Sequence, residues 1–124
     1  VEDSEVSAEK FADAYGCRPE GAKYFNAGVL LLNLSRVREE GGFRTAIDFL
    51  AERDPLLADQ DSLNWRYWDQ WRALRKEWNV QAPTAIYASQ GTATGEWAEA
   101  AARPAIVHFT GGAKPWSPKE YHPW

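Results

Sequence analysis

The stretch AIVHFTGGAKPW, from Ala105 to Trp116, decides the expected fold. Its first five residues form a short apolar run bounded by Arg103-Pro104 and by the pair Gly111-Gly112. Such a run predicts a brief buried strand, and the glycines predict the loop that follows it. Ligands of open α/β sheets bind beyond the carboxyl ends of strands. We therefore expect His108 and the loop after it to lie at a binding edge.

The residue types of this loop suit a metal ion and an anion. The imidazole of His108 can bind a divalent cation when it is neutral. The pair Gly111-Gly112 lets backbone N–H groups approach an anion, and Lys114 brings a positive charge to a phosphate. Pro115-Trp116 would stiffen the loop. The spacing is not that of a P-loop, and the alternative is a surface turn with a half-buried histidine.

The upstream stretch YFNAGVLLLNL, residues 24–34, carries the longest apolar run of the chain. Its length and its loop-like flanks predict a fully buried strand. Asn26, at the start of this stretch, offers both the donor and the acceptor groups that sugar hydroxyls need. The alternative for Asn26 is an asparagine that caps a turn before the strand.

A third polar segment is ADQDSLN, residues 58–64. Asp59, Gln60 and Asp61 would fan out at the start of a helix, where the helix dipole favours carboxylates. The alternative is plain helix capping by Asp59 or Asp61. An Asp-x-Asp pair fills only part of a metal coordination sphere, so a metal here would need further ligands.

Helical and strand-like segments alternate along the chain, which favours an α/β fold. The remaining expected elements are helices over 7–15, 36–40 (capped by Ser35), 43–53 and 95–102, a helix that begins near Asp59 and carries Leu63, Tyr67 and Trp71, a short strand at 78–81, and a loop over 82–95 with a brief strand near 85–87. Two or three strands make a marginal sheet, so we expect the chain to be part of a larger one.

Composition narrows the class of partner. A chain of 124 residues fits one domain, and its net charge of −4 provides neither the basic footprint of a nucleic-acid binder nor a polybasic membrane patch. The lone Cys17 and the lack of a membrane-length apolar run favour a cytoplasmic protein. Seven tryptophans either pack in the core or contact a sugar, and composition does not decide between the two.

The segments YFNAGVLLLNLSRVRE, ADQDSLN, EWNVQ and IVHFTGGAKPW, in this order, resemble glycosyltransferase family 8. The family includes bacterial lipopolysaccharide galactosyltransferases and glycogenin. The resemblance covers most of residues 24–116. It implies the mixed sheet with flanking helices of a GT-A type nucleotide-diphosphosugar transferase. It also implies Mn²⁺-dependent (or Mg²⁺-dependent) retaining transfer of glucose or galactose from a UDP-sugar to a carbohydrate or glycolipid acceptor, as in lipopolysaccharide biosynthesis.

The resemblance also implies roles for single residues. His108 would be a metal ligand, and Asp59 and Gln60 would act at the reacting sugar. The remaining donor-binding positions would be Asn26, Ala27, Gly111, Gly112, Ala113, Lys114, Pro115 and Trp116.

The sequence departs from the family pattern upstream. The family's Asp-x-Asp metal motif and its uridine site belong to an N-terminal half, and neither precedes Tyr24. We therefore expect residues 1–124 to be the C-terminal part of one catalytic domain, with the nucleotide-binding half absent and the isolated chain inactive. The alternatives are a non-catalytic carbohydrate-binding module and a degenerate transferase remnant. Membrane association has little support, because the tail SPKEYHPW is not basic.

Overall fold

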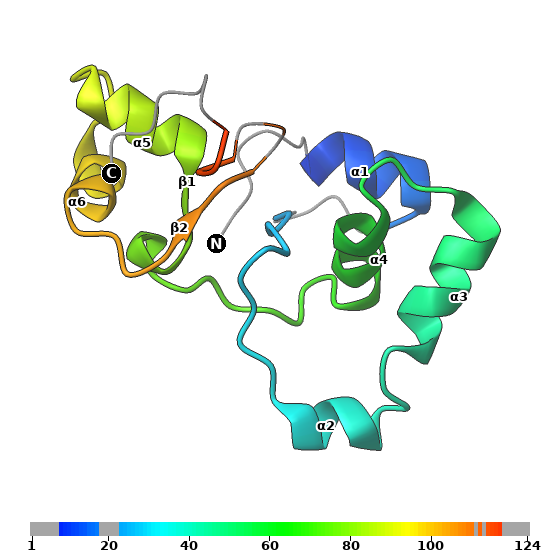
Figure 1. The fold of residues 1–124 in the computed structure, drawn as a ribbon. Helices are drawn as coiled ribbons and strands as arrows, with labels where there is room; N and C mark the ends of the chain where they lie inside the picture. The colour runs from blue at the N-terminus through cyan, green and yellow to red at the C-terminus, as the bar shows by residue number, and fades with distance from the viewer. Residues whose placement is uncertain (1–7, 18–22, 111, 113, 118–124) are drawn as a thin grey trace. The chain divides into compact units, whose positions relative to one another are not determined.

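The computed structural model describes residues 8–17, 23–110, 112 and 114–117, which form mostly short helices and one small sheet (Figure 1). The chain divides into two compact units that meet between residues 73 and 74. The combination of helices with a parallel pair of strands confirms the α/β class.

The first unit is helical. Its elements are α1 (Ala8–Tyr15), α2 (Leu34–Glu39), α3 (Arg44–Arg53) and α4 (Ala58–Arg66). The expected helix over 43–53 is confirmed as α3, and the break after it lies at Asp54, which has a left-handed backbone with φ of 44°. Ala46 and Phe49 form the buried face of α3, while Ile47 is exposed.

Aromatic side chains form the core of this unit. Trp65 of α4 stacks on Phe49 of α3, with 4.9 Å between ring centroids. Trp68 stacks on Phe11 at 5.5 Å, and Trp71 meets Phe25 edge to face at 5.2 Å. Such pairs stabilise a core beyond the area they bury. Three of the seven tryptophans therefore act in packing.

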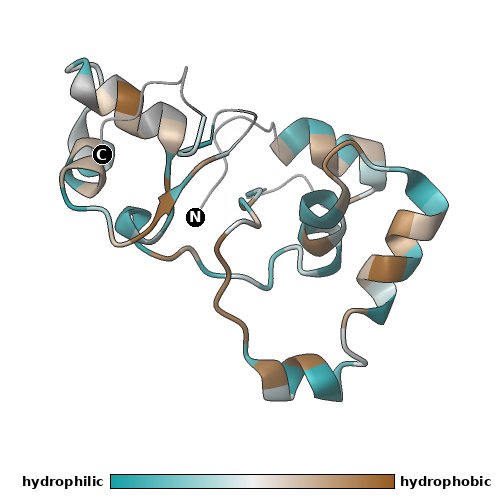
Figure 2. Ribbon diagram, viewed as in Figure 1, coloured by the Kyte–Doolittle hydropathy of each residue, from teal (hydrophilic) through white to brown (hydrophobic). Residues whose placement is uncertain are grey.

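The expected buried strand over residues 24–34 is wrong. Residues 30–33 have no regular structure, and Leu31 is 83% exposed. Figure 2 shows the segment that leads into α2 as hydrophobic. A strand needs a neighbour that shares its backbone hydrogen bonds. Within this segment only Phe25 is assigned to an isolated β-bridge, and the sheet of the described residues joins 80–81 to 107–108.

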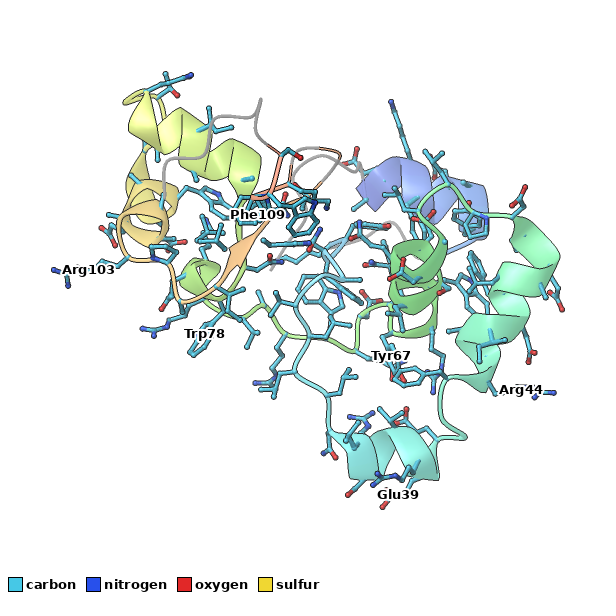
Figure 3. All side chains as sticks on the ribbon, in the orientation of Figure 1. Glu39, Arg44, Tyr67, Trp78, Arg103 and Phe109 are labelled. Carbon is cyan, nitrogen blue, oxygen red and sulfur yellow. The ribbon has the colours of Figure 1, made fainter. Side chains whose placement is uncertain are left out.

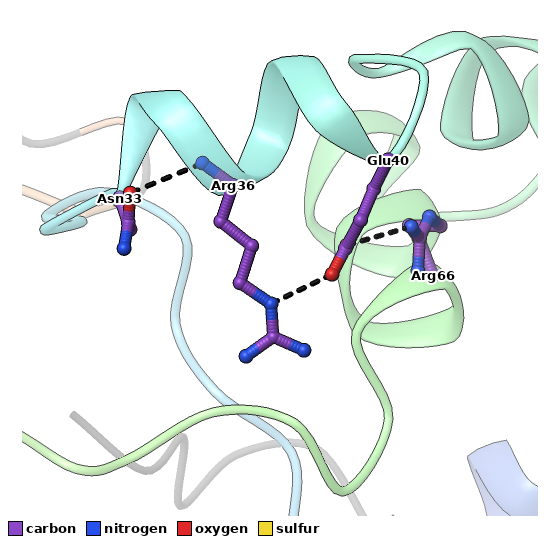
Figure 4. Close-up of polar contacts among 4 residues, drawn as sticks. All are labelled: Asn33, Arg36, Glu40 and Arg66. Carbon is purple, nitrogen blue, oxygen red and sulfur yellow. Dashed lines mark hydrogen bonds and ion pairs between the residues drawn. The ribbon is translucent and has the colours of Figure 1, made fainter.

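Helix α2 begins two residues earlier than expected. The side chain of Asn33, rather than Ser35, accepts a hydrogen bond from Arg36 N–H at 3.1 Å. At the other end, the Glu40 carboxylate contacts Arg36 Nε at 2.6 Å and a terminal nitrogen of Arg66 in α4 at 3.0 Å (Figure 4). The hydrogen bond from Arg36 lowers the pKa of Glu40 below its ordinary value. Glu40 thus ties α2 to α4 through charge.

The second unit holds the sheet. Its elements are the 3-10 helix η1 (Lys76–Asn79), β1 (Val80–Gln81), α5 (Ala82–Ser89), α6 (Gly95–Ala102) and β2 (Val107–His108). The strands run parallel, with Val80 opposite Val107 and Gln81 opposite His108. The strand expected at 78–81 is found only at residues 80–81, because residues 78–79 belong to η1. The strand expected after Arg103-Pro104 is found as β2, which is half-buried rather than buried. The helix over 95–102 is confirmed as α6.

The loop expected over 82–95 is wrong in its first half, and so is the brief strand expected near 85–87, because α5 occupies residues 82–89. The proline that suggested a loop lies in the first turn of this helix, where a missing backbone N–H removes no helical hydrogen bond. Val80, Ala85 and Ala100 form the buried core that joins β1, α5 and α6. Figure 3 shows Trp78 and Arg103 directed away from this core. No helix within the described ranges is long and apolar enough to cross a membrane.

Candidate functional site

Helix α4 holds the backbone of residues 24–27 with its side chains. Phe25 N–H donates to Asn64 Oδ1 at 2.8 Å, and Asn64 Nδ2 donates to Phe25 C=O at 2.8 Å. The same nitrogen also donates to Gln60 C=O at 2.9 Å. Asn64 has no solvent exposure and Phe25 has 5%. One carboxamide therefore satisfies both backbone groups of a buried residue, as a neighbouring strand would.

The predicted sugar-site residues Asn26, Ala27 and Gln60 lie together at this contact. Ala27 N–H donates to Gln60 Oε1 at 2.9 Å. Asn26 is buried, and its Oδ1 accepts a hydrogen bond from Gly28 N–H at 3.0 Å, which is an Asx turn. The turn-capping alternative for Asn26 is thus observed, and its contact with a sugar stays a prediction.

Asp61, in the first turn of α4, contacts the same region. Its two carboxylate oxygens accept hydrogen bonds from Tyr24 Oη at 2.5 Å and from Leu57 N–H at 2.9 Å. Asp61 is 5% exposed and Tyr24 is 1% exposed. Neither Asp59 nor Asp61 is the expected N-cap, because α4 begins after Leu57, whose side chain makes no capping hydrogen bond. Asp61 lies inside the helix, where it accepts a hydrogen bond from Leu57 N–H and fixes Tyr24.

Asp59 lies in the first turn of α4 and is exposed to solvent. Ser62 Oγ donates to Asp59 C=O at 2.9 Å, which leaves the Asp59 carboxylate outside that contact. The first turn of α4 thus presents an exposed carboxylate next to the half-buried carboxamide of Gln60. A pair of this kind can accept hydrogen bonds from sugar hydroxyls and can stabilise positive charge at a sugar ring.

The second unit places His108 at the carboxyl end of β2, as expected. Its Nδ1 lies 3.0 Å from Oδ1 of Asn79, the last residue of η1. Asn79 has no solvent exposure, whereas His108 is half-buried. The parallel register, with Gln81 opposite His108, brings residue 79 within reach of that side chain. A buried asparagine just before a strand carried a signal for this contact, although the sequence reasoning gave Asn79 no role.

The loop after β2 is described in part. Lys114 Nζ donates to Phe109 C=O at 2.7 Å, so the lysine folds back over the end of the strand. A side chain added at Gly112 would meet open space, and Pro115 and Trp116 are exposed. The predicted donor residues Gly111 and Ala113 lie outside the described residues. Lys114 and His108 therefore occur at the same strand end.

His108 suits a metal ion in its donor chemistry. An imidazole nitrogen is a common metal ligand. A ligating histidine usually makes a hydrogen bond through its other ring nitrogen, as His108 does with Asn79. Where the structure describes the chain, no three His, Cys, Asp or Glu side chains cluster so that they could hold a metal by themselves. His108 thus fits a metal ion as one ligand of a larger set.

Comparison with known proteins bears on this arrangement. The sequence model described as Glycosyl transferase family 8 matches residues 2–120 of the chain. The match therefore includes the α4 contact, the Asn79–His108 pair and the loop that follows.

Two bacterial proteins are similar over most of the chain. General stress protein A of Bacillus subtilis is 35% identical over 109 residues, which cover 82% of this chain and 38% of that protein. Glycosyltransferase GlyF of Streptococcus pneumoniae is 31% identical over 111 residues, which cover 84% of this chain and 25% of that protein. The chain thus spans less than two fifths of the length of these relatives. No solved structure gives a significant match.

Proposed function

This chain belongs to glycosyl transferase family 8, and on that premise we propose that it forms the sugar-binding and diphosphate-binding part of a retaining hexosyltransferase. The donor would be UDP-glucose or UDP-galactose, and the acceptor a carbohydrate or a glycolipid. The observation that carries the proposal is the contact of α4 with residues 24–27, which gathers Asn26, Ala27 and Gln60.

The sugar pocket would be preorganised by backbone contacts. The hydrogen bond from Ala27 N–H fixes the Gln60 carboxamide, and the Asx turn fixes Asn26. Side chains that are held before substrate arrives lose little conformational freedom on binding. Asp59 and Gln60 would then act at the reacting sugar, with the exposed Asp59 carboxylate stabilising the positive charge that develops on the ring.

The diphosphate would lie at the carboxyl end of β2. Lys114 and the backbone N–H groups near Gly111, Gly112 and Ala113 would neutralise the negative charge that grows on the leaving UDP. Lys114 already donates to Phe109 C=O at 2.7 Å, which keeps its ammonium group at the strand end. Pro115 and Trp116 would close the loop over the phosphates.

Mn²⁺ or Mg²⁺, when bound, would supply further positive charge to the diphosphate, with His108 as its ligand from this chain. Because Nδ1 faces Asn79, Nε2 would be the ring nitrogen in that role. The other ligands would come from outside the described residues, since within these no group of three His, Cys, Asp or Glu side chains could hold a metal ion.

Retention of the anomeric configuration follows a particular route in this proposal. A carboxamide such as Gln60 is a poor nucleophile, so a covalent intermediate on this side chain is disfavoured. The acceptor would instead attack from the face that UDP leaves, with the leaving diphosphate accepting the proton of the acceptor hydroxyl. The fold around it would be the mixed sheet of a GT-A type transferase.

A second candidate function has one observation in its favour. Leu30, Leu31, Leu32 and Leu34 are all exposed, at 39%, 83%, 38% and 52%. A transferase remnant that packs on another polypeptide predicts an exposed apolar segment of this kind. A carbohydrate-binding module built on tryptophan faces has less support, because Trp65 and Trp68 stack inside the first unit.

The proposal is tested by following UDP release from UDP-glucose and UDP-galactose by the full-length protein, with Mn²⁺ and with a chelator. We expect release that needs the metal and falls at least about tenfold in Asp59→Asn, since the charge at the sugar ring is lost. Asp48→Asn, an exposed aspartate on α3, is the matched control. Equal rates in both variants, or no release with either donor, would count against the transferase.

A further inference from the structure

Among the described residues, Asn79 is a buried polar side chain that touches a residue of the proposed metal site, and no role has yet been assigned to it. It ends η1, directly before β1, and has no solvent exposure. Its Oδ1 lies 3.0 Å from Nδ1 of His108, across 29 residues of sequence. A buried carboxamide is costly unless its groups are hydrogen-bonded, so this contact is a determinant of local structure.

We propose that Asn79 is a positioning residue that holds His108 in the tautomer with the proton on Nδ1, so that Nε2 keeps the ring lone pair for the metal. The inference rests on the proposed function. A carboxamide oxygen only accepts hydrogen bonds, so the ring nitrogen that faces it must carry the proton. In a neutral imidazole the other nitrogen is then the acceptor and the ligating atom.

The backbone around the pair makes the contact rigid. Val80 N–H, next to Asn79, donates to Ile106 C=O at 3.0 Å, and Ala105 N–H donates to Glu77 C=O at 2.8 Å. These bonds join η1 and β1 to the segment that carries His108. The backbones that carry the two side chains are therefore fixed relative to each other by the parallel pair of strands. The metal would meet an imidazole whose direction is already set, which lowers the entropy lost on binding.

The tautomer can be read directly by NMR without any metal. The chain has two histidines, His108 and His122, so long-range proton–nitrogen correlation spectra of the ¹⁵N-labelled protein are easily assigned by His108→Gln. At about pH 8 an ordinary imidazole, with a pKa near 6.5, is neutral. We expect His108 to show a protonated Nδ1 and an unprotonated Nε2. Protonation at Nε2 in the unaltered protein would overturn the inference.

Two substitutions separate positioning from a general structural role. Asn79→Asp keeps an acceptor oxygen and should keep the tautomer, while Asn79→Leu removes the acceptor and should shift His108 toward protonation at Nε2. If Asn79→Leu folds with the tautomer unchanged, or if Asn79→Asp loses it, the inference fails. Where Asn79→Leu does not fold, the spectra of the unaltered protein and of Asn79→Asp still decide.

Metal binding supplies the second readout. Mn²⁺ added with UDP to the full-length protein should broaden the His108 ring signals, and Asn79→Leu should raise the Mn²⁺ concentration needed by about 10–100-fold. Equal concentrations for both proteins would overturn the positioning role. If Mn²⁺ leaves the His108 signals of the unaltered protein sharp, the metal step of the proposed function fails, and the tautomer spectra alone judge Asn79.

Discussion

The contact of Asn64 with Phe25 leads to a quantitative prediction for Asn64→Ala. The substitution removes the partner of Phe25 N–H and of Phe25 C=O, each of which lies 2.8 Å from the Asn64 carboxamide. Phe25 is only 5% exposed, so water does not readily replace that partner. A buried backbone group without a partner costs about 1–3 kcal/mol, so two such groups cost about 2–6 kcal/mol. The cavity left by the side chain adds to this loss.

A matched control is available in the same unit. Asn33→Ala removes one exposed hydrogen bond, the cap to Arg36 N–H, and should cost only about 1 kcal/mol. Urea denaturation, followed by tryptophan fluorescence, gives the unfolding free energy of each variant. We expect the loss in Asn64→Ala to be at least twice that in Asn33→Ala.

Hydrogen exchange provides an independent check. In the unaltered protein the Phe25 amide should be among the protected amides, because Asn64 holds it in a buried site. An Asn64→Ala variant that is as stable as Asn33→Ala, with the Phe25 amide still protected, would refute the reasoning that this carboxamide holds the segment.

Three further predictions concern charge and reactivity. The pKa of Glu40 is lowered in the folded protein, so its contribution to stability is present above the ordinary glutamate pKa of about 4.3 and is lost as pH falls through the folded-state value. In Glu40→Gln the unfolding free energy should therefore fall less steeply as the pH is lowered. Burial, with a smaller effect from Asp69, raises the pKa of the Cys17 thiol, so at neutral pH iodoacetamide should alkylate it more slowly in folded than in urea-unfolded protein. Lys114→Ala should weaken UDP binding by about 10–150-fold and Lys114→Arg much less, as measured by calorimetry, because a charged hydrogen bond contributes about 1.5–3 kcal/mol; equal losses in both variants would argue against a role for the charge.

Local sequence signals predicted the helices well where both ends carried a clear stop. Helix α6 begins at Gly95 and ends before Arg103-Pro104, and its bounds match the expectation. Helix α5 was missed because prolines and threonines are typical of loops, although a proline in the first turn is equally typical of a helix start.

The errors on the segment 24–34 have a different origin. Its apolar run fits a buried strand, but burial depends on a partner that the run itself does not specify. In the structure, residues 24–27 are the part that α4 holds. The partner of Phe25 is Asn64, which lies 39 residues further along the chain. Single-segment patterns contain no information on such a partner.

The sequence predicted the candidate site residues themselves, but not the residues that hold them in place. The resemblance pointed to Gln60 and His108, because these residues stand in recognisable segments. The residues that hold them, Asp61, Asn64 and Asn79, are polar side chains that become buried only through tertiary contacts. A polar residue within an otherwise matching segment is the sequence signal for such a support, and EWNVQ contains one in Asn79.

The central claim is that His108 belongs to a metal-dependent UDP site. The most direct test is calorimetry of UDP binding to the full-length protein, with and without Mn²⁺, for the unaltered protein, His108→Ala and His122→Ala. We predict binding that needs Mn²⁺, a loss of at least about tenfold in His108→Ala, and no change in His122→Ala. Binding of UDP without a metal requirement, unchanged in His108→Ala, would contradict the account.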